Sequence, residues 1–355
     1  MSAAVREIAR APVRCAASTL ADVLIVDDSI VARSVIGRYV EESRRARVVG
    51  AVSCAEAALA FLRTQRVDVI LLDIAMPGRD GLAALPDLLG AAAGAKVLVI
   101  SSAVGVGAAA TLQALALGAA DTLVKPASGE PSRRFGTALI EKLTTLAEAQ
   151  PGHLPVATGL PLRHEYDVVA IGASTGGIYA LGQLLQAIPA SVETPILITQ
   201  HLPASFTPVF ARQVAAMAGR PCDVGEDRLR IRPSRVIVAP GTAHLRCVRT
   251  TDGAAIRLST RPAISGCTPS VDPMFESVAE TFGARALGVV LSGMGRDGSE
   301  GARRLTACGA GVVVQDRESS TVWGMPGSVA ALGCARAILP PAQIGELIAS
   351  GGRAA

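Results

Sequence analysis

The sequence contains few aromatic residues and almost as many acidic as basic side chains. Phe, Trp and Tyr make up 3% of the 355 residues, and Trp occurs once. The 34 basic and 30 acidic residues leave a formal charge of +4, which is too balanced for the clustered basic surface typical of nucleic-acid-binding domains. Half of the residues are hydrophobic, so small aliphatic side chains must do most of the packing. We therefore expect a globular protein with no nucleic-acid partner.

Long hydrophobic runs and paired cysteines are also missing. No apolar run reaches the roughly 18 residues of a membrane span without a glycine, a proline or a charged residue. The seven cysteines are scattered, with neither a C-x-x-C pair nor the spacing of a metal site. Residues 1–20 lack the continuous apolar stretch of a secretory signal, and we expect a disordered leader there. These absences predict a reduced, cytoplasmic protein that does not insert into a membrane.

The length of 355 residues predicts two domains, since one domain takes roughly 150 residues. Between residues 22 and 126, short apolar runs alternate with helical patterns. This alternation predicts a flavodoxin-like α/β domain, in which helices cover both faces of a five-stranded parallel sheet. We place this domain at 21–130, followed at 131–165 by its terminal helix and a linker rich in proline and glycine. The predicted strands are VLIV, RVVGAV, VDVILL, KVLVI and TLV.

A second alternating region, at 166–352, predicts a doubly wound, mainly parallel α/β domain. Shorter strands are expected at 229–231, 243–249 and 255–260, with a small hairpin around Asp252-Gly253. The main predicted strands are 167–171, 195–199, 235–239 and 286–291, and the predicted helices are 178–188, 205–217 and 300–308.

Acidic and cationic side chains gather at the predicted carboxyl ends of the strands in the first domain. Asp27 and Asp28 follow the first strand, Asp73 ends the third, Ser101 ends the fourth, and Lys125 follows the fifth. Open parallel sheets place their sites at this edge. Crowded carboxylates repel one another, and Mg²⁺ would neutralise them while one carboxylate acts as a nucleophile toward phosphorus. The alternative is that each aspartate caps the helix that follows it.

The motifs LIVDDS, LLDIAMPGRDGL, VISS and GAADTLVKP resemble those of a response-regulator receiver domain. The resemblance implies that Asp73 is the phosphorylated residue. It also implies that Ser101 and Lys125 respond to the phosphoryl group. The implied Mg²⁺ ligands are Asp27, Asp28, Asp73 and the backbone carbonyl of Ala75.

Thr122 departs from the receiver pattern. Three residues before the lysine, receivers usually carry Phe or Tyr, whose ring changes orientation on phosphorylation. We expect the phosphorylation chemistry to survive this change and the transmission of the signal to differ.

In the second domain, the segment GASTG at 172–176 joins a predicted strand to a predicted helix and matches G-x-S-x-G. Glycines allow the sharp turn that lifts a serine hydroxyl above the edge of a sheet, and the helix N-terminus offers N–H groups to an oxyanion. A dinucleotide-binding loop is the alternative, but it requires an acidic residue at the end of the next strand. That strand is followed by Gln200 and His201, so Ser174 is predicted to be a nucleophile.

A serine nucleophile needs a base and a carboxylate that orients the base. His201 is the preferred base, because sequential strands usually lie side by side with their carboxyl ends about 5 Å apart. His244, which follows a later strand, stays open as the alternative. Asp297 lies in the turn SGMGRDG and supplies the carboxylate, unless it only caps the next helix. The order Ser, His, Asp differs from that of the α/β-hydrolases.

The segments GASTGG, QHLP, APGTAHL, PSVDPMF, SGMGRDG and WGMP closely resemble the catalytic domain of the CheB family of chemotaxis protein-glutamate methylesterases. With the receiver, the resemblance covers nearly the whole chain outside the leader and the linker. It implies a triad of Ser174, His201 and Asp297 and no cofactor for ester hydrolysis. The other implied site residues are Thr175 and Met294, whose backbone N–H groups would bind the oxyanion, and His244 and Trp323 as candidate substrate contacts.

The resemblance also implies the reaction and the partners. The substrate would be the γ-methyl ester of glutamate on methyl-accepting chemotaxis receptors, where specific glutamines would also be deamidated. A chemotaxis histidine kinase would donate the phosphoryl group, and the unphosphorylated receiver would pack over the serine site. A DNA-binding response regulator is the alternative, but the second domain has no compact helix-turn-helix with a basic recognition helix.

Overall fold

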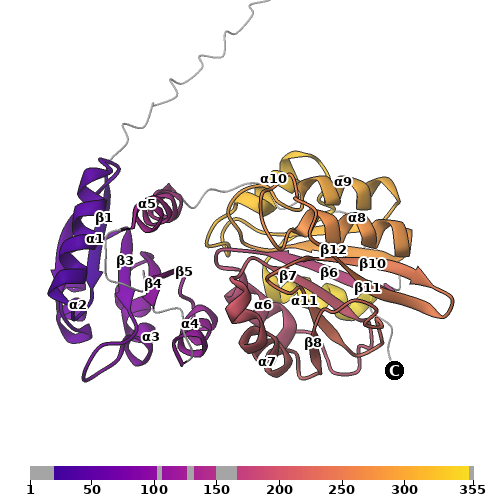
Figure 1. Ribbon diagram of the computed structural model, residues 1–355, viewed down its shortest axis with the longest axis horizontal. Helices are drawn as coiled ribbons and strands as arrows, with labels where there is room; N and C mark the ends of the chain where they lie inside the picture. Colours follow the sequence, from indigo (N-terminus) through magenta and orange to yellow (C-terminus); the bar gives the residue numbers. More distant parts are fainter. Residues whose placement is uncertain (1–19, 102–105, 126–131, 149–165, 352–355) are drawn as a thin grey trace, which may run out of the picture.

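The computed structural model describes residues 20–101, 106–125, 132–148 and 166–351. The predicted leader, up to residue 19, and the predicted linker at 149–165 lie outside these ranges. The described residues form two parallel sheets, each with helices on both faces (Figure 1). The predicted α/β class with two such domains and a small hairpin is confirmed.

The N-terminal sheet has the strand order β2-β1-β3-β4-β5, and every neighbouring pair is parallel. Its central strand β3 is buried along its whole length, as a sheet covered on both faces requires. Helices α1 and α5 pack on one face, and α2, α3 and α4 pack on the other. The strands are β1 (Ala21–Val26), β2 (Ala46–Val52), β3 (Val69–Asp73), β4 (Lys96–Ser101) and β5 (Asp121–Val124). The helices are α1 (Ile30–Glu42), α2 (Ala55–Leu62), α3 (Gly81–Ala91), α4 (Val106–Ala116) and α5 (Arg133–Glu148).

The C-terminal sheet has the order β14-β13-β12-β6-β7-β9-β8 and is parallel throughout. Helices α6, α7 and α11 cover one face, and α8, α9 and α10 cover the other. The strands are β6 (Val168–Ala173), β7 (Ile196–Gln200), β8 (Cys222–Val224), β9 (Val236–Val238), β12 (Ala286–Val290), β13 (Gly311–Gln315) and β14 (Ala337–Leu339). The helices are α6 (Gly177–Gln186), α7 (Thr207–Ala218), α8 (Val271–Phe282), α9 (Ser299–Ala307), α10 (Gly324–Ala331) and α11 (Pro341–Gly351), with short 3₁₀ turns η1 (Ala204–Phe206) and η2 (Gly283–Arg285).

The antiparallel hairpin of β10 (His244–Thr250) and β11 (Gly253–Ser259) packs against α8 and confirms the turn predicted at Asp252-Gly253. Most predicted elements are present with ends shifted by a few residues. The prediction of a strand at 229–231 is wrong. There Arg230 makes a single bridge to Ala255. Pro233 follows shortly and has no N–H group with which to continue the pairing.

The two domains meet where α4 packs against α6, α7 and η1. Leu112 and Leu115 of α4 belong to the same buried apolar cluster as Ile178 and Leu181 of α6. In Figure 1, α4 and α5 form the edge of the N-terminal domain that faces the C-terminal domain. No described helix has both the length and the apolar character that a membrane crossing requires.

Candidate active site

The carboxyl ends of β1 and β3 bring three predicted aspartates together. One carboxylate oxygen from each of Asp27, Asp28 and Asp73 lies within 4.8 Å of the others. Asp27 and Asp73 are buried, and the Lys125 ammonium donates hydrogen bonds to both, at 2.8 and 2.6 Å. Ser101 points elsewhere: its hydroxyl lies 2.7 Å from that of Thr111 in α4. The structure therefore joins four of the five predicted groups and ties the fifth to α4.

Charge balance holds this cluster together. Burial raises the pKa of Asp73, although the hydrogen bond and the charge of Lys125 oppose the rise. Burial likewise disfavours the Lys125 ammonium, but Asp27 and Asp73 outweigh that effect and raise its pKa. Three carboxylates at one open edge are the hard oxygen donors that Mg²⁺ takes, so the residues fit this cation. Ala75 donates its backbone N–H to Asp73 Oδ1 at 3.2 Å, and its carbonyl stays a predicted ligand.

Thr122 lies in β5, three residues before Lys125. Its hydroxyl oxygen is buried and has no hydrogen-bond partner among the described residues. The threonine side chain is too small to take the place of the aromatic ring that receivers usually carry at this position. The substitution leaves a buried hydroxyl group in β5 instead.

Ser174 follows directly after β6, in a turn that only glycine allows. Gly176 has a φ of 76°, a left-handed conformation that favours glycine, and a β-carbon there would collide with Thr321. The turn places Ser174 at the carboxyl edge of the sheet, beside the start of α6.

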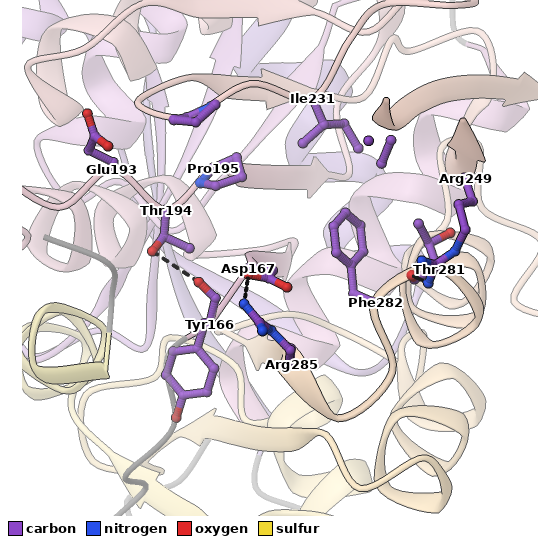
Figure 2. A pocket seen from close by; sticks show the side chains of 13 residues that line it. Tyr166, Asp167, Glu193, Thr194, Pro195, Ile231, Arg249, Thr281, Phe282 and Arg285 are labelled. Atoms are coloured by element: carbon purple, nitrogen blue, oxygen red, sulfur yellow. Dashed lines mark hydrogen bonds and ion pairs between the residues drawn. The ribbon is translucent and has the colours of Figure 1, made fainter. Parts of the chain in front are cut away.

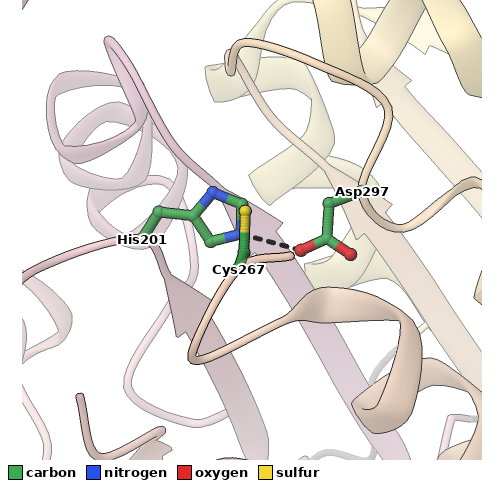
Figure 3. A group of neighbouring side chains, drawn as sticks. All are labelled: His201, Cys267 and Asp297. Atoms are coloured by element: carbon green, nitrogen blue, oxygen red, sulfur yellow. Dashed lines mark hydrogen bonds and ion pairs between the residues drawn. The ribbon is translucent and has the colours of Figure 1, made fainter. Parts of the chain in front are cut away.

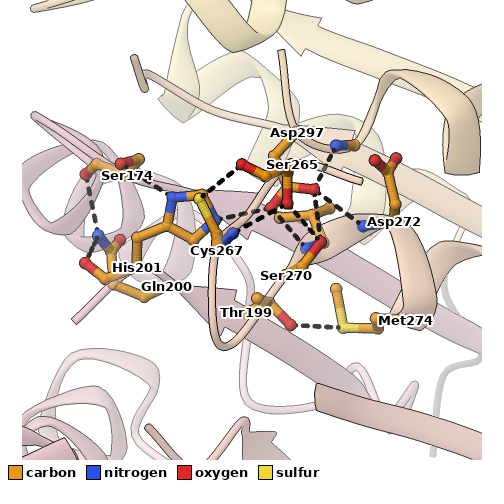
Figure 4. Close-up of polar contacts among 12 residues, drawn as sticks. Ser174, Thr199, Gln200, His201, Ser265, Cys267, Ser270, Asp272, Met274 and Asp297 are labelled. Atoms are coloured by element: carbon orange, nitrogen blue, oxygen red, sulfur yellow. Dashed lines mark hydrogen bonds and ion pairs between the residues drawn. The ribbon is translucent and has the colours of Figure 1, made fainter. Parts of the chain in front are cut away.

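His201 follows β7, which pairs with β6 as predicted. Its Nδ1 lies 3.2 Å from Ser174 Oγ, and its Nε2 lies 2.7 Å from Asp297 Oδ2. Figure 4 shows the three side chains in line from Ser174 through His201 to Asp297. The structure thus brings together the nucleophile, base and carboxylate predicted from three separate strand ends.

Asp297 is 3% exposed and is held by the N-terminus of α8. Its carboxylate accepts hydrogen bonds from the Ser270 hydroxyl at 2.7 Å and from the backbone N–H groups of Val271 at 2.8 Å and Asp272 at 3.2 Å. The following helix α9 begins at Ser299 with Gly298 as its N-cap, and Asp297 also accepts the Gly298 N–H at 3.0 Å. Asp297 is therefore not the N-cap residue of α9, and its carboxylate binds mainly to the start of α8.

Asp297 and His201 stabilise each other's charge. Burial alone would raise the pKa of Asp297, but the hydrogen bond and charge of His201 and the α8 N–H groups lower it to about 2. Burial disfavours the imidazolium, but Asp297 and the nearby Cys267 outweigh that effect and raise the pKa of His201 to about 9. Burial and the adjacent Asp297 raise the pKa of Asp272 to about 7. The Asp297 carboxylate thus stays ionised and oriented toward the imidazole.

Two backbone N–H groups near Ser174 are available to an oxyanion. Among the described residues, no acceptor is found for the N–H of Thr175 or of Met294. Gly293, which precedes Met294, lies so close to the serine that a β-carbon there would collide with Ser174 and Met325. This close approach brings the turn that carries Met294 next to the nucleophile.

The N-terminal domain covers this site. Thr175 Oγ1 donates to Asp121 Oδ2 at 2.6 Å, and Lys142 Nζ pairs with the same carboxylate at 2.5 Å. The Gly176 N–H donates to the Ala120 carbonyl at 2.8 Å. A cavity of about 110 Å³ is lined from both domains, by Leu115, Ala119, Ala120, Asp121 and Lys142 on one side and by Ser174, Thr175, His201 and their neighbours on the other.

Neither His244 nor Trp323 lines the cavity beside Ser174, although the Trp323 backbone pairs with Gly293 in the neighbouring turn. His244 is 1% exposed; its Nδ1 accepts from the Ser270 N–H at 2.9 Å, and its Nε2 lies 2.8 Å from the Arg261 carbonyl. Both ring nitrogens therefore bind the backbone, which favours His201 as the base and does not favour a substrate contact at His244. Trp323 Nε1 donates to the Gln315 carbonyl at 2.8 Å, and the ring borders an interdomain cavity with Arg317.

A larger cavity of about 570 Å³ lies at the opposite edge of the C-terminal sheet (Figure 2). Tyr166, Asp167 and Arg285, which line it, precede the amino ends of β6 and β12. Asp167 and Arg285 form an ion pair there. None of the predicted site residues lines this cavity.

Comparison with known proteins agrees with this geometry. The CheB methylesterase family matches residues 169–348, and the response regulator receiver domain family matches residues 23–132. The chain belongs to the CheB methylesterase family. It is a methylesterase of the CheB type with a phosphorylatable receiver domain, and the receiver fold is consistent with Mg²⁺-dependent phosphorylation.

Relatives of the CheB family resemble the chain over most of its length. The protein-glutamate methylesterase/protein-glutamine glutaminase 2 of Caulobacter vibrioides is 40% identical over 347 residues, which cover 93% of this chain and 99% of that protein. The protein-glutamate methylesterase/protein-glutamine glutaminase of Maricaulis maris is 37% identical over 387 residues, covering 94% and 96%. The crystal structure of the Thermotoga maritima CheB methylesterase catalytic domain has a TM-score of 0.50 and 32% identity, covering 52% of this chain and 98% of that chain.

Three side chains beside Ser174, His201 and Asp297 were not singled out from the sequence. Gln200 Nε2 donates to the Ser174 carbonyl at 2.9 Å, Ser270 donates to Asp297, and Cys267 lies against His201 and Asp297. Gln200 is the first residue of the segment QHLP, and Ser270 is the second residue of PSVDPMF. The motifs therefore carried a signal for both. Cys267 belongs to no quoted motif, and only the folding of its loop brings it to the site.

Proposed function

We propose that the chain is a phosphorylation-activated serine hydrolase that demethylates glutamate γ-methyl esters on methyl-accepting chemotaxis receptors. The observation that carries the proposal is the hydrogen-bonded line of Ser174, His201 and Asp297 at a sheet edge that the receiver covers. We propose a cytoplasmic location and a role in sensory adaptation.

In the proposed mechanism, Ser174 Oγ attacks the ester carbonyl while His201 Nδ1 accepts its proton. His201 then returns the proton to the leaving methanol, and water hydrolyses the acyl-serine with the same base. Asp297 keeps the proton of the neutral ring on Nε2 and stabilises the imidazolium. The N–H groups of Thr175 and Met294 stabilise the oxyanion, and losing one such donor typically costs about 10²-fold or more in rate.

Deamidation of glutamine follows the same course with ammonia as the leaving group. His201 must protonate the amide nitrogen as it leaves, which is the role it has toward methanol. The names of the relatives, which include protein-glutamine glutaminase, support this second activity.

In the receiver, we propose that Asp73 accepts the phosphoryl group from a chemotaxis histidine kinase. Asp27, Asp28, Asp73 and the Ala75 carbonyl would hold Mg²⁺, which supplies positive charge beside the phosphoryl oxygens. Lys125 and Ser101 would then bind those oxygens. Lys125 already reaches Asp73, whereas Ser101 must leave Thr111 to do so.

Methanol release from methylated receptor membranes tests both halves of the proposal. We expect Ser174→Ala to abolish hydrolysis whatever the state of the receiver. We expect Asp73→Asn to keep the basal rate and to lose the stimulation by acetyl phosphate and Mg²⁺. Substantial hydrolysis by Ser174→Ala would refute the nucleophile, and equal stimulation of Asp73→Asn and wild type would refute the phosphorylation site.

A further inference from the structure

Cys267 brings a thiol to the triad, and no step of the proposed hydrolysis uses it. One ligand atom from each of His201, Cys267 and Asp297 lies within 4.8 Å of the others. Figure 3 shows the Cys267 sulfur beside the imidazole, on the side that faces Asp297. A thiol, an imidazole and a carboxylate are thus gathered at one point, from three separate loops.

The loop that carries Cys267 is anchored to the same carboxylate. The backbone N–H of Cys267 lies 3.3 Å from Ser265 Oγ, and Ser265 Oγ donates to Ser270 Oγ at 3.1 Å. Ser270 in turn donates to Asp297 at 2.7 Å. This chain of hydrogen bonds holds the thiol next to the triad, while Cys267 and His201 are both partly exposed and open to a small ion.

We propose that His201, Cys267 and Asp297 form a binding site for Zn²⁺, and that Zn²⁺ bound there inhibits the hydrolysis. Thiolate, imidazole and carboxylate are the three side-chain ligands that Zn²⁺ takes in proteins. Three protein ligands leave the fourth tetrahedral position to water. The site goes beyond the proposed function, and only its inhibitory effect rests on that function.

Ligand chemistry separates this site from the receiver cluster. Hard cations such as Mg²⁺ prefer oxygen and gain little from a thiolate, whereas Zn²⁺ favours sulfur and nitrogen. Asp27, Asp28 and Asp73 offer only carboxylate oxygens. We therefore expect Mg²⁺ in the receiver to leave the Cys267 site free.

The geometry requires only small movements. With Zn–S near 2.3 Å and Zn–N and Zn–O near 2.1 Å, the ligand atoms of a tetrahedral site lie roughly 3.4 to 3.6 Å apart. The distance of 2.7 Å between His201 Nε2 and Asp297 Oδ2 must open, and the thiol must approach from within 4.8 Å. The neighbours of Cys267 in its loop, Gly266 and Thr268, are exposed, so the loop has room to move.

Inhibition follows from the proton on the ring. Nε2 is the nitrogen that faces Asp297, so Zn²⁺ bound between them occupies Nε2 and leaves the ring proton on Nδ1. Nδ1 is the atom that faces Ser174 and must accept its proton. A protonated Nδ1 cannot do so. Binding also displaces the thiol proton, because the ligand is the thiolate.

Co²⁺ is the direct probe of the site, because a thiolate ligand gives Co²⁺ a near-ultraviolet charge-transfer absorption that oxygen ligands do not. Full-length protein without a histidine tag is stripped with a chelator, supplied with excess Mg²⁺ and titrated with Co²⁺. We expect the band in wild type and in Ser174→Ala, and its loss in Cys267→Ser and Cys267→Ala. Cys54→Ser, a partly exposed cysteine of the receiver, is the matched control and should keep the band.

Zn²⁺ titration of methanol release tests the inhibition, with each variant compared with its own rate in chelator. Changes to second-sphere partners typically weaken metal binding about 10- to 100-fold, so loss of the Cys267 ligand should raise the half-inhibiting Zn²⁺ concentration at least about tenfold. A thiolate band that persists in both Cys267 variants, or none in wild type, overturns the site. Equal Zn²⁺ sensitivity of wild type and Cys267→Ser overturns the inhibition. If the esterase proposal itself were wrong, the result would differ from both of these outcomes, because wild type would then release no methanol even in chelator.

Discussion

At the scale of single residues, the environment of His201 predicts the pH dependence of the reaction. In the proposed mechanism His201 must be neutral to accept the Ser174 proton, and its pKa is raised to about 9. Below this pKa most of the protein carries imidazolium, so the rate should rise with pH, about tenfold per unit, and level off near the pKa. Methanol release measured across this range, with the Ser174→Ala rate subtracted for spontaneous ester hydrolysis, checks the prediction. A rate independent of pH below the His201 pKa would contradict it.

Asp297→Asn separates the contribution of the carboxylate's charge from that of the side chain's size. The amide keeps the size of the side chain but loses the charge, and the equivalent change in a serine protease costs about 10⁴-fold in kcat. We expect a loss of this order in kcat. We also expect the midpoint of the residual pH profile to move down, because Asp297 supplies part of the effect that raises the pKa of His201 and Cys267 supplies the rest. Asp272→Asn is the matched control: Asp272 contacts Asp297 but neither Ser174 nor His201, so the loss should be much smaller.

The proximity of Ser174, His201 and Asp297 was predictable because each residue directly follows a strand or lies in the turn after one. Ser174, His201 and Asp297 come after β6, β7 and β12, and parallel strands bring their carboxyl ends to one edge. Cys267 was not predictable in this way. It lies between β11 and α8, where no periodic pattern places the chain.

At the scale of elements, β5 links the receiver to the catalytic turn. Asp121 begins β5 and accepts the Thr175 hydroxyl hydrogen bond, while Lys125 follows the strand and binds Asp73. A hydrogen bond to a charged group contributes about 1.5 kcal/mol or more. Asp121→Ala should therefore shift the equilibrium, by roughly tenfold, toward molecules in which the receiver no longer covers Ser174. We expect the basal hydrolysis to rise without acetyl phosphate, and the further stimulation by acetyl phosphate to shrink.

Asp87→Ala is the control for this change. Asp87 is also a receiver aspartate in an ion pair, with Arg79, but it lies on α3 away from the C-terminal domain. It should leave both the basal and the stimulated rate as in wild type. An unchanged basal rate in Asp121→Ala would show that this contact does not restrain the enzyme.

Most strands with long apolar runs were predicted. Strands such as β3 and β6 are buried throughout and show as continuous Val, Ile and Leu runs. The strands β8, β13 and β14 were missed. β8 and β14 have three residues each, and so short a run carries little signal, whereas the valine run of the buried strand β13 did carry one. The contact of Asp121 with Thr175 also gave no signal, since it depends on how two domains pack.

At the scale of the whole molecule, the proposed phosphorylation site and the candidate active site lie on either side of one domain contact. Ser101 is tied to Thr111 of α4, and α4 packs on α6 directly behind the Ser174 turn. Thr145 of α5 donates to Met294 Sδ at 3.3 Å, and the N–H of Met294 is the second proposed oxyanion donor. A receiver that moves α4, β5 or α5 therefore moves groups that touch both sides of the serine.

The single tryptophan of the chain can report such a movement. Trp323 borders a cavity of about 490 Å³ that is lined from both domains, with Lys96, Thr145 and Glu148 of the receiver on the opposite side. The Arg317 guanidinium lies over its ring, 5.8 Å from the centroid.

If phosphorylation separates the domains, water reaches the indole of Trp323 and the maximum of its fluorescence emission moves to longer wavelength. Adding acetyl phosphate and Mg²⁺ should produce this shift in wild type and in Ser174→Ala, because neither hydrolysis nor substrate is involved. Asp73→Asn should show none. A shift of equal size in Asp73→Asn, or an unchanged spectrum in wild type whose hydrolysis is stimulated, would exclude domain separation at this interface as the means of activation.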